Sequence, residues 1–509
     1  MNPLWGIMIR NEKFDLTILI LVSLLLTIYL FFRTYVISLD GAFQYVPIAK
    51  DLASGFFRRA LSHNQQPLYP LIIASVSRWV PDFELAGKLV SSFFGILIIF
   101  PVYFLGKRIF DARIAFVSTL FLVIHPYIRR FSADVLKEST YLFFTATALW
   151  FAWRAIQDER KYPFLFIPIV SVLAYLVRPD GIEVLLVAFF YVLFIRKFSI
   201  PRSKRTVILL LILSSCILLL PYLFYIGELR GEWTFGKAKS ITEMLGVGVP
   251  KDGVPITHKI LYSLKRLNLE ILAIGHPAYV FLLIVGLLKG IFSRFKSGEG
   301  FLLSFCLLHY VVLFLLILNV TEWGGDGTIK AGYLSGRHVL PLLLFSIYWV
   351  GEGFMVIYRW ICKKAKSILL FRRLTSTRQS VIIFLAGLVL ILAIVLPKTL
   401  KPQKYERLPE KWAGIWIKSQ SGKGLIIFTT APRVAYYADG NFEYVDFQKD
   451  KFDQVTTSMA EKKALYLAIR EKEVANFPQH AEAIKRDFVE LARFEGKGME
   501  KIIVYRLGQ

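Results

Sequence analysis

The sequence predicts a polytopic α-helical membrane protein of about eleven spans, followed by a small α/β domain outside the membrane. Hydrophobic residues make up 55% of the 509 residues, and the mean hydropathy is +0.53. Long apolar runs alternate with short basic clusters up to about residue 397. A soluble enzyme with one large core does not show this alternation, so these observations exclude that class.

Each apolar run marks an expected transmembrane helix. A helix perpendicular to the membrane needs roughly 20 apolar residues, and several of the runs are shorter than this. The first run follows Arg10 and Lys13 and has no small-residue cleavage site behind it, which favours an uncleaved anchor over a signal peptide. The expected spans lie near residues 16–38, 86–106, 114–126, 139–155, 163–177, 181–196, 206–226, 278–292, 300–319, 338–358 and 380–397.

The net charge of +25 is arranged as a topology signal rather than as a nucleic-acid footprint. Residues 398–509 carry +5 of this charge, and the other +20 lies in short clusters between the apolar runs. The clusters are consistent with a cytoplasmic N-terminus, and an odd number of spans then places the C-terminus outside. We therefore expect a multi-pass protein of the inner or plasma membrane, without a nucleic-acid partner.

The chain divides into two predicted domains, a membrane domain over residues 1–397 and an extracytoplasmic α/β domain over residues 398–509. In the second domain, alternating or apolar stretches predict strands near 424–430, 442–447, 464–469 and 501–506, with helices near 410–419 and 480–487. It contains no phosphate-binding glycine motif, paired metal ligands or nucleophile elbow. We expect it to recognise a partner or to shield the membrane site rather than to perform chemistry.

Asp40 is the first candidate functional residue, because it directly follows the first apolar run and begins a polar segment between two expected spans. A carboxylate at a membrane rim requires solvation by water or a partner, and such acids often mark functional sites. The alternative is an aspartate that merely ends a helix.

The rest of the first outer loop, residues 39–85, carries candidate substrate contacts. It contains the run Gln65-Gln66-Pro67-Leu68-Tyr69-Pro70, followed by the short apolar stretch from Leu71 to Val80. That stretch is too short to cross a bilayer and ends in Arg78 and Trp79, which suits the headgroup zone. It predicts an interfacial helix, which either walls a lipid-access groove or only packs against the bundle.

Three later outer segments carry further charged candidates. Residues 125–138 include Arg130, Asp134, Lys137 and Glu138; if this segment is helical, Asp134 and Glu138 share a face. A solvated loop with local ion pairs is the alternative. The segment 178–181, Arg-Pro-Asp-Gly, predicts a turn between two short spans.

Arg337 and His338 stand just before the span expected at 338–358. Because a helix dipole already places positive charge at an N-terminus, an arginine there is favourable only beside an anion, which makes Arg337 a phosphate candidate. The stretch 227–277 shows no strong periodicity and is expected to be a long outer loop, which either covers substrate or is simply mobile.

The order of these motifs resembles the polyprenyl-phosphate-sugar glycosyltransferases of the GT-C fold. The similar group is the protein mannosyltransferase-like one, which includes aminoarabinose transferases and bacterial lipopolysaccharide sugar transferases, and the resemblance covers about residues 10–397. It implies an enzyme that moves a sugar from a polyprenyl-phosphate donor to an envelope lipid, glycan or protein at the outer membrane face. Membrane lipids are its other expected partners.

Two departures from the family pattern concern the site. Many relatives carry an Asp-Glu pair in the first loop, whereas Asp40 is followed by Gly41 here. In the aminoarabinose transferases a lysine precedes Pro-Pro-Leu and helps to hold the donor phosphate, but this chain has Gln65 and Gln66 before Pro67. Phosphate binding would then fall to the arginines Arg130, Arg178 and Arg337.

The expected chemistry assigns Asp40 the role of general base, which takes the proton of the acceptor hydroxyl during inverting attack on the anomeric carbon. A fixed guanidinium stabilises the charge that grows on the leaving lipid phosphate. A divalent cation is helpful but not required, and the sequence offers no metal ligand set or cofactor motif. His309, inside an expected span, is interpreted as a packed core residue. The predicted substrate contacts are Gln65, Gln66, Tyr69, Asp134, Glu138 and His338.

A membrane transporter or lipid-linked-sugar flippase is the competing functional class. Such proteins often show internal repeats and charged groups near the middle of the membrane. Here the acids lie in outer loops and no clear internal repeat is visible. A non-enzymatic envelope protein, whose outer domain binds a partner, is a third interpretation.

Overall fold

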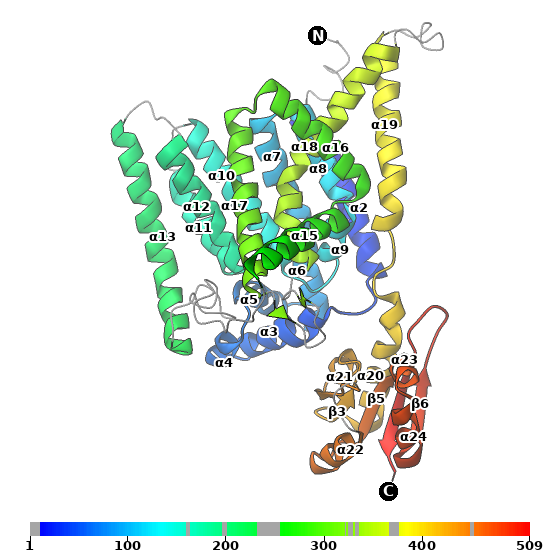
Figure 1. Cartoon of the computed structure of the whole chain (residues 1–509). Coiled ribbons are helices and arrows are strands. Elements are labelled where there is room, and N and C mark those ends of the chain that lie inside the picture. Colours follow the sequence, from blue (N-terminus) through cyan, green and yellow to red (C-terminus); the bar gives the residue numbers. More distant parts are fainter. Residues whose placement is uncertain are drawn as a thin grey trace.

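The structure is a computed structural model, which describes residues 11–158, 163–195, 201–231, 255–320, 322–323, 329–330, 335–365, 376–447 and 452–508. A bundle of long helices forms the body of the molecule, and helix α19 leads from it to a small domain built on a sheet (Figure 1). This arrangement confirms the predicted fold class of a polytopic helical protein with a C-terminal α/β domain. The boundary at residues 397 and 398 stays a prediction.

The first half of the bundle begins with one long helix and continues through shorter, broken ones. Asp82 and Asp111 cap two of these helices, because each side chain accepts hydrogen bonds from two backbone N–H groups of the following turn. The elements are α2 (Glu12–Arg33), η1 (Gly41–Tyr45), α3 (Val46–Ala53), α4 (Phe57–Ser62), α5 (Leu68–Val76), α6 (Phe83–Leu97), α7 (Ile99–Ile109), α8 (Ala112–Val123), α9 (Pro126–Ser132) and α10 (Glu138–Asp158).

The second half contains the longest helices of the chain, which line up beside the first half in Figure 1. A short antiparallel pair, β1 (Glu322–Trp323) with β2 (Ile329–Lys330), precedes α18. The helices are α11 (Pro163–Tyr175), η2 (Pro179–Ile182), α12 (Glu183–Phe190), η3 (Tyr191–Ile195), α13 (Pro201–Arg230), α15 (Ile256–Ile274), α16 (Pro277–Ser293), α17 (Ser297–Val320), α18 (Gly336–Ala365) and α19 (Ser376–Thr399).

The number of spans is smaller than the predicted eleven. Among the described residues, six helices are long and apolar enough to cross a membrane, and up to eight if each bent helix pair is one span. Each expected apolar run does coincide with a helix, but some helices are short: α11 has 13 residues and α12 has 8. A helix of 13 residues is only about 20 Å long, which is less than the hydrocarbon thickness.

The prediction of a loop over residues 227–277 was wrong for its last part, because Ile256–Ile274 forms helix α15. Its Leu264, Leu267 and Ile271 recur at helical spacing among basic residues, a pattern that marks an amphipathic helix. The chain then bends by 109° into α16. Helix α15 runs across the bundle in Figure 1 rather than along it. Residues 232–254 of the predicted loop lie outside the described part of the chain.

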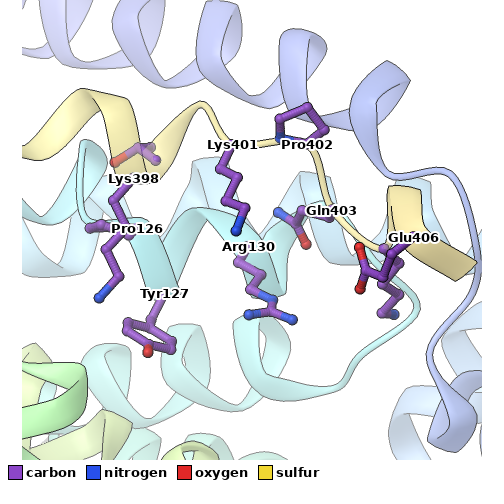
Figure 2. A pocket seen from close by; sticks show the side chains of 10 residues that line it. Pro126, Tyr127, Arg130, Lys398, Lys401, Pro402, Gln403 and Glu406 are labelled. Atoms are coloured by element: carbon purple, nitrogen blue, oxygen red, sulfur yellow. The ribbon is translucent and has the colours of Figure 1, made fainter. Parts of the chain in front are cut away.

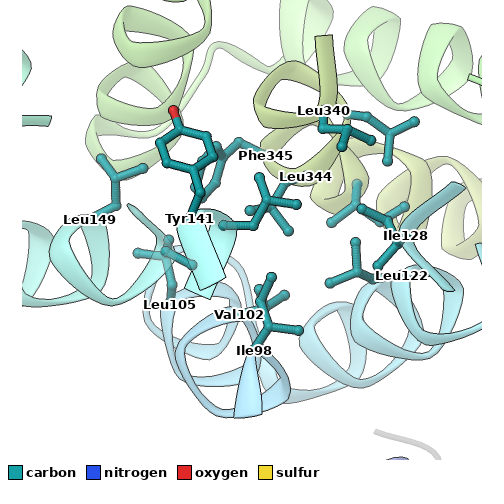
Figure 3. Close-up of a cluster of buried hydrophobic side chains, with 14 of the residues drawn as sticks. Ile98, Val102, Leu105, Leu122, Ile128, Tyr141, Leu149, Leu340, Leu344 and Phe345 are labelled. Atoms are coloured by element: carbon teal, nitrogen blue, oxygen red, sulfur yellow. The ribbon is translucent and has the colours of Figure 1, made fainter. Parts of the chain in front are cut away.

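The core of the bundle is formed by apolar side chains of α6, α7, α8, α10 and α18, part of which Figure 3 shows. Helices α16 and α18 approach each other closely through two glycines. A Cβ on Gly286 would lie 1.9 Å from the carbonyl oxygen of Trp349, and a Cβ on Gly353 would lie 1.9 Å from that of Leu282. Small residues permit such backbone contact between membrane helices.

The C-terminal domain is a five-stranded mixed sheet with helices. Strand order is β4-β3-β5-β7-β6, in which β3 pairs parallel with β4 and β5, and β7 pairs antiparallel with β5 and β6. The elements are η5 (Tyr405–Arg407), α20 (Leu408–Ser421), β3 (Ile426–Thr429), α21 (Arg433–Tyr437), β4 (Asn441–Tyr444), α22 (Phe452–Glu461), β5 (Tyr466–Arg470), α23 (Glu471–Asn476), α24 (Pro478–Asp487), β6 (Phe488–Phe494) and β7 (Ile502–Leu507).

The four predicted strands and both predicted helices of this domain are present, and β6 was missed. Strand β6 is an edge strand, and three of its seven residues after Phe488 are exposed in succession. An edge strand with one weakly buried face lacks the regular alternation that identifies a strand in a sequence. The register of β6 with β7 also shifts between Glu490 and Ala492.

Candidate active site

Asp40 lies at the start of η1, in the loop after α2, with about a quarter of its side chain exposed. The segment before it is fixed by a network: the Ser38 N–H donates to Asp134 Oδ1 at 3.1 Å, and the Ser38 hydroxyl donates to the Val135 carbonyl at 2.9 Å. The Gly41 N–H donates to Ser38 Oγ at 3.1 Å. The chain therefore holds the backbone on both sides of Asp40 in place.

The structure also explains why glycine follows Asp40. A Cβ on Gly41 would lie 2.8 Å from Ser38 Oγ and 2.9 Å from side-chain atoms of both Ile37 and Val135. No side chain fits there without movement of the packed neighbours. The Asp-Glu pair of the resembling family therefore has no space in this loop.

Arg337 is the ion-pair partner of Asp40. Its Nη1 contacts Asp40 Oδ2 and lies 3.8 Å from Glu138 Oε1, so one guanidinium faces two carboxylates. Glu138 is almost completely buried, and its Oε2 has no hydrogen-bond partner among the described residues. The predicted residues Asp40, Glu138 and Arg337, far apart in the sequence, thus form one cluster.

Lys137 is a second cation beside this cluster, and no substrate or phosphate contact was predicted for it. Its Nζ donates to Gln65 Oε1 at 2.7 Å and lies 5.6 Å from the centre of the Tyr45 ring. Burial, and then the neighbouring charge of Arg178, lower the pKa of Lys137 to about 8. Its position next to Glu138 in a charged loop was the only hint in the sequence.

Arg178 is held on several sides. Its Nε donates to Asp180 Oδ1 at 3.1 Å, its Nη2 lies 2.9 Å from Asp180 Oδ2, and its Nη1 donates to the Arg337 carbonyl at 3.0 Å. Burial would raise the pKa of Asp180, but the charges of Arg178, His309 and His338 together with the Arg178 hydrogen bond outweigh this and place that pKa below its ordinary value. The guanidinium also lies 4.8 Å from the centre of the Tyr141 ring. This geometry fixes the first turn of α18, which carries Arg337.

His338 extends the same support. Its carbonyl oxygen lies 2.8 Å from His309 Nε2, while His309 Nδ1 lies 2.7 Å from Glu183 Oε2. The His338 Nδ1 lies 3.1 Å from the carbonyl oxygen of Ser335. His309 is completely buried, which confirms its interpretation as a hydrogen-bonded core residue.

Gln66 and Tyr69 are buried inside the protein, although they belong to the predicted first outer loop. Gln66 is buried; its Oε1 accepts a hydrogen bond from the Tyr222 hydroxyl at 2.5 Å, and its Nε2 has no partner among the described residues. Tyr69 is fully buried, with its hydroxyl 2.8 Å from Ser91 Oγ and its ring against Tyr45. Their predicted contact with substrate stays a prediction.

Asp134 and Arg130 contact the segment after α19 rather than Asp40 itself. The segment between α9 and α10 is not helical, so Asp134 and Glu138 do not share a helical face. Asp134 forms an ion pair with Lys404 of the segment after α19. Arg130 lines a pocket with residues of that same segment, shown in Figure 2.

Tyr45 lies under the charged cluster and remains neutral. Burial raises the pKa of Tyr45 well above its ordinary value, and the charges of Glu138 and Asp40 add to the rise. Tyr45 is therefore a buried, uncharged neighbour of the two carboxylates. No group of three or more potential metal ligands occurs among the described residues.

An apolar groove of about 340 Å³ includes Val339, which is two residues beyond Arg337 on α18. It follows α18 from Val339 to Val350, which is about 17 Å along a helix axis. Helices α15, α16 and α17 supply its other walls, including Ile271, Leu283 and Leu303. An apolar channel along a membrane helix can accept a hydrocarbon chain.

The chain resembles one known protein family and several solved structures. Residues 64–225 match the profile of the family described as dolichyl-phosphate-mannose-protein mannosyltransferase. A comparison with curated proteins gave no match. Among solved structures, ArnT from Cupriavidus metallidurans bound to undecaprenyl phosphate is similar, with a TM-score of 0.60 and 13% identity over 97% of this chain and 98% of that chain.

Two further structures share the fold. One is the archaeal oligosaccharyltransferase AglB from Archaeoglobus fulgidus, in complex with an inhibitory peptide and a dolichol-phosphate, with a TM-score of 0.55 and 12% identity over 98% of this chain and 74% of that one. The other is the arabinofuranosyltransferase AftD from Mycobacteria, with a TM-score of 0.54 and 13% identity over 98% of this chain and 42% of that chain. Likenesses at such identities establish the fold.

Proposed function

We propose that this chain, which matches the dolichyl-phosphate-mannose-protein mannosyltransferase family over residues 64–225, is a membrane glycosyltransferase that inverts the anomeric centre of a polyprenyl-phosphate sugar. The acceptor is an envelope lipid, glycan or protein. The observation that carries the proposal is the ion pair between Asp40 and Arg337, beside Glu138 and Lys137 and close to the apolar groove.

Asp40 acts as the general base in this proposal. The acceptor hydroxyl attacks the anomeric carbon and gives its proton to the Asp40 carboxylate as the new glycosidic bond forms. The bond between the anomeric carbon and the phosphate oxygen breaks, and polyprenyl phosphate leaves with the bonding electrons. Within the described part of the chain, Asp40 Oδ1 accepts no hydrogen bond, which leaves one carboxylate oxygen for the acceptor.

Arg337 and Lys137 stabilise the leaving phosphate. Charge on this group increases as a phosphodiester becomes a monoester, so fixed cations stabilise the transition state more than the ground state. Arg337 Nη1 faces both carboxylates and its Nε donates to Ser335 Oγ at 3.4 Å, so the guanidinium is fixed in place. Lys137, held on Gln65, compensates for the lysine that this chain lacks before Pro67.

Arg178 supports Arg337 instead of touching the donor. Its donors are used by Asp180 and by the Arg337 carbonyl, so we assign it a positioning role. Gly181 makes this turn possible, because a Cβ there would lie 2.3 Å from the Tyr175 backbone nitrogen. The Arg178 guanidinium, through its hydrogen bond to the Arg337 carbonyl, then fixes the backbone that carries the Arg337 side chain.

The apolar groove holds the polyprenyl tail. Val339, a lining residue of the groove, is two residues beyond Arg337 on α18. A donor whose phosphate contacts Arg337 therefore has its lipid chain close to the groove. The structure of ArnT from Cupriavidus metallidurans was solved with undecaprenyl phosphate, which is a ligand of this chemistry. Figure 1 places α3, α4 and the C-terminal domain at the same end of the bundle, and the basic loops predict that this end is extracytoplasmic.

Transfer by the purified protein tests the proposal. The wild-type chain and Asp40→Asn are incubated in detergent with candidate polyprenyl-phosphate sugars, and transfer or donor hydrolysis is followed by mass spectrometry. We expect Asp40→Asn to bind donor and to lose turnover by about 10²-fold or more, the range typical of an essential base. Normal turnover by folded Asp40→Asn removes this residue from the mechanism.

Asp51→Asn is the matched control, because Asp51 lies in the same loop and also pairs with an arginine, Arg59, outside the site. It should keep wild-type turnover. Equal losses in both variants would indicate a general disturbance of the loop. Vesicle uptake of the lipid-linked sugar without any product would instead identify a transporter.

A further inference from the structure

A second pocket lies apart from the Asp40 cluster, between α9 and the segment that joins α19 to the C-terminal domain. Its volume is about 300 Å³. We call it the basic pocket; its lining is Pro126, Tyr127, Arg130, Lys398, Thr399, Lys401, Pro402, Gln403, Lys404 and Glu406. Figure 2 shows the Lys401 side chain extending toward Arg130, whose guanidinium lies farther along in the same direction.

The basic pocket has an excess of positive charge. Four cations and one carboxylate, Glu406, line it. Lys404 is neutralised by Asp134, and Lys398 lies 5.0 Å from the centre of the Tyr127 ring. Arg130 and Lys401 form no ion pair with a described residue. The cavity holds more cations than its one carboxylate can neutralise, and an anion bound beside Arg130 and Lys401 reduces the repulsion between them.

The position of the pocket at the end of a candidate membrane span indicates which kind of anion it binds. Lys398 and Thr399 belong to the last turn of α19, which is one of the candidate spans, so the pocket opens where that span ends. Basic residues just outside a span are attracted to the phosphates of lipid headgroups. Tyr127 adds an aromatic wall of the kind found at this depth.

The pocket is also connected to the active-site loop. Lys404 pairs with Asp134, and Asp134 accepts the Ser38 N–H two residues before Asp40. Burial lowers the pKa of Lys404, and the charges of Arg433 and Arg130 contribute to the decrease. An anion on Arg130 reduces this repulsion and strengthens the pairing of Lys404 with Asp134.

We propose that the basic pocket is a binding site for a phosphate group carried by an anionic lipid headgroup, separate from the donor site at Arg337. Arg130 and Lys401 contact the phosphate, and Lys398 with Tyr127 borders the lipid side of the pocket. The site is independent of sugar transfer, because it needs neither Asp40 nor Arg337.

Binding of short-chain phosphatidylglycerol to the full-length protein in detergent tests the proposal. Short-chain phosphatidylcholine is the neutral comparison, and inorganic phosphate is the competitor. We expect saturable binding of one phosphatidylglycerol per chain, weakened by about tenfold or more in Arg130→Gln with Lys401→Gln, since each removes a charge-assisted hydrogen bond. Arg506→Gln with Lys497→Gln is the charge-matched control, because both cations are exposed in the C-terminal domain; it should bind like the wild type.

The competitor identifies the source of the phosphate group. Phosphatidylglycerol that binds at least about tenfold more tightly than inorganic phosphate supports a lipid headgroup, because the glycerol lipid then adds contacts. Equal affinities support a site for free phosphate anions and overturn the lipid assignment. Equal weakening in the two double variants, or no saturable binding, overturns the site itself. Because no donor is present, the result does not depend on whether the chain transfers a sugar.

Discussion

Arg433 of the C-terminal domain donates its Nε–H to the backbone carbonyl of Ile37 at 2.8 Å, three residues before Asp40. The Ile37 N–H in turn donates to the Tyr437 hydroxyl at 2.9 Å. Both backbone polar groups of Ile37, in the active-site loop, are thus bound by helix α21. Arg433 is itself anchored by the fully buried Glu410 at 3.1 Å. The C-terminal domain therefore has a direct part in positioning the loop.

Removal of the Tyr437 hydroxyl should slow catalysis without weakening donor binding. Tyr437→Phe leaves the buried Ile37 N–H without an acceptor, which costs about 1–3 kcal/mol and loosens the loop before Asp40. We expect kcat to fall by about tenfold at an unchanged KM for the donor. The neighbouring Tyr436→Phe, which removes no contact to Ile37, should behave like the wild type. A change in KM alone would contradict a positioning role.

Lys137 should make kcat/KM for the donor decrease at alkaline pH. Its pKa is about 8, so the amine is charged below this pH and neutral above it. Because kcat/KM reports the free enzyme, kcat/KM for the donor should fall as the pH rises through about 8. Lys137→Arg should move this decrease to higher pH, and Lys137→Gln should remove it and lower kcat/KM throughout. Lys50→Gln, an exposed lysine on α3, should leave the decrease unchanged.

Arg337 should be more sensitive to shape than to charge. Arg337→Gln removes the cation from two carboxylates and from the donor phosphate, and we expect a loss of about 10²–10³-fold in kcat/KM. Arg337→Lys keeps the charge but not the planar fork, so it should recover only part of this loss. Steady-state kinetics over a range of donor concentrations measures both. Arg154→Gln is the control, because Arg154 lies at the end of α10 opposite to Glu138. Unchanged kinetics in Arg337→Gln would exclude phosphate contact.

Gly41 should tolerate no side chain. A Cβ there would lie 2.8 Å from Ser38 Oγ, so Gly41→Ala forces a shift of the loop that costs about 1–3 kcal/mol. We expect a lower Tm and reduced turnover. Gly300→Ala is the control, because nothing lies within 4 Å of a Cβ at that position. It should leave Tm unchanged or raise it.

The sequence predicted the fold class because apolar runs and strand patterns are local signals. The helices that became α6, α16, α17 and α18, and the strands β3, β4, β5 and β7, each follow from a continuous stretch of residues. Helix α15 was missed because its apolar residues alternate with lysine and arginine. The span count was too high because an apolar run shows that a helix is buried and does not show that it crosses a bilayer.

The site could be predicted only in part. Asp40 and Arg337 were singled out separately by their positions at span ends, but their contact joins residues 297 positions apart. The pairing of Asp134 with Lys404 and the contact of Lys137 with Gln65 are equally non-local. Such pairs are created by the packing of helices, which no single stretch of sequence encodes.

Arg337 pairs with Asp40 and is also the proposed ligand of the donor phosphate, so the two substrates should act in a fixed order. Without a donor, its guanidinium faces Asp40, and the enzyme holds its own base in a self-neutralised form. An arriving phosphate competes for that same guanidinium and releases the carboxylate. We therefore expect an ordered reaction, in which Asp40 becomes strongly basic only when a lipid-linked sugar is present, so that an acceptor which binds first to the open carboxylate oxygen does not react.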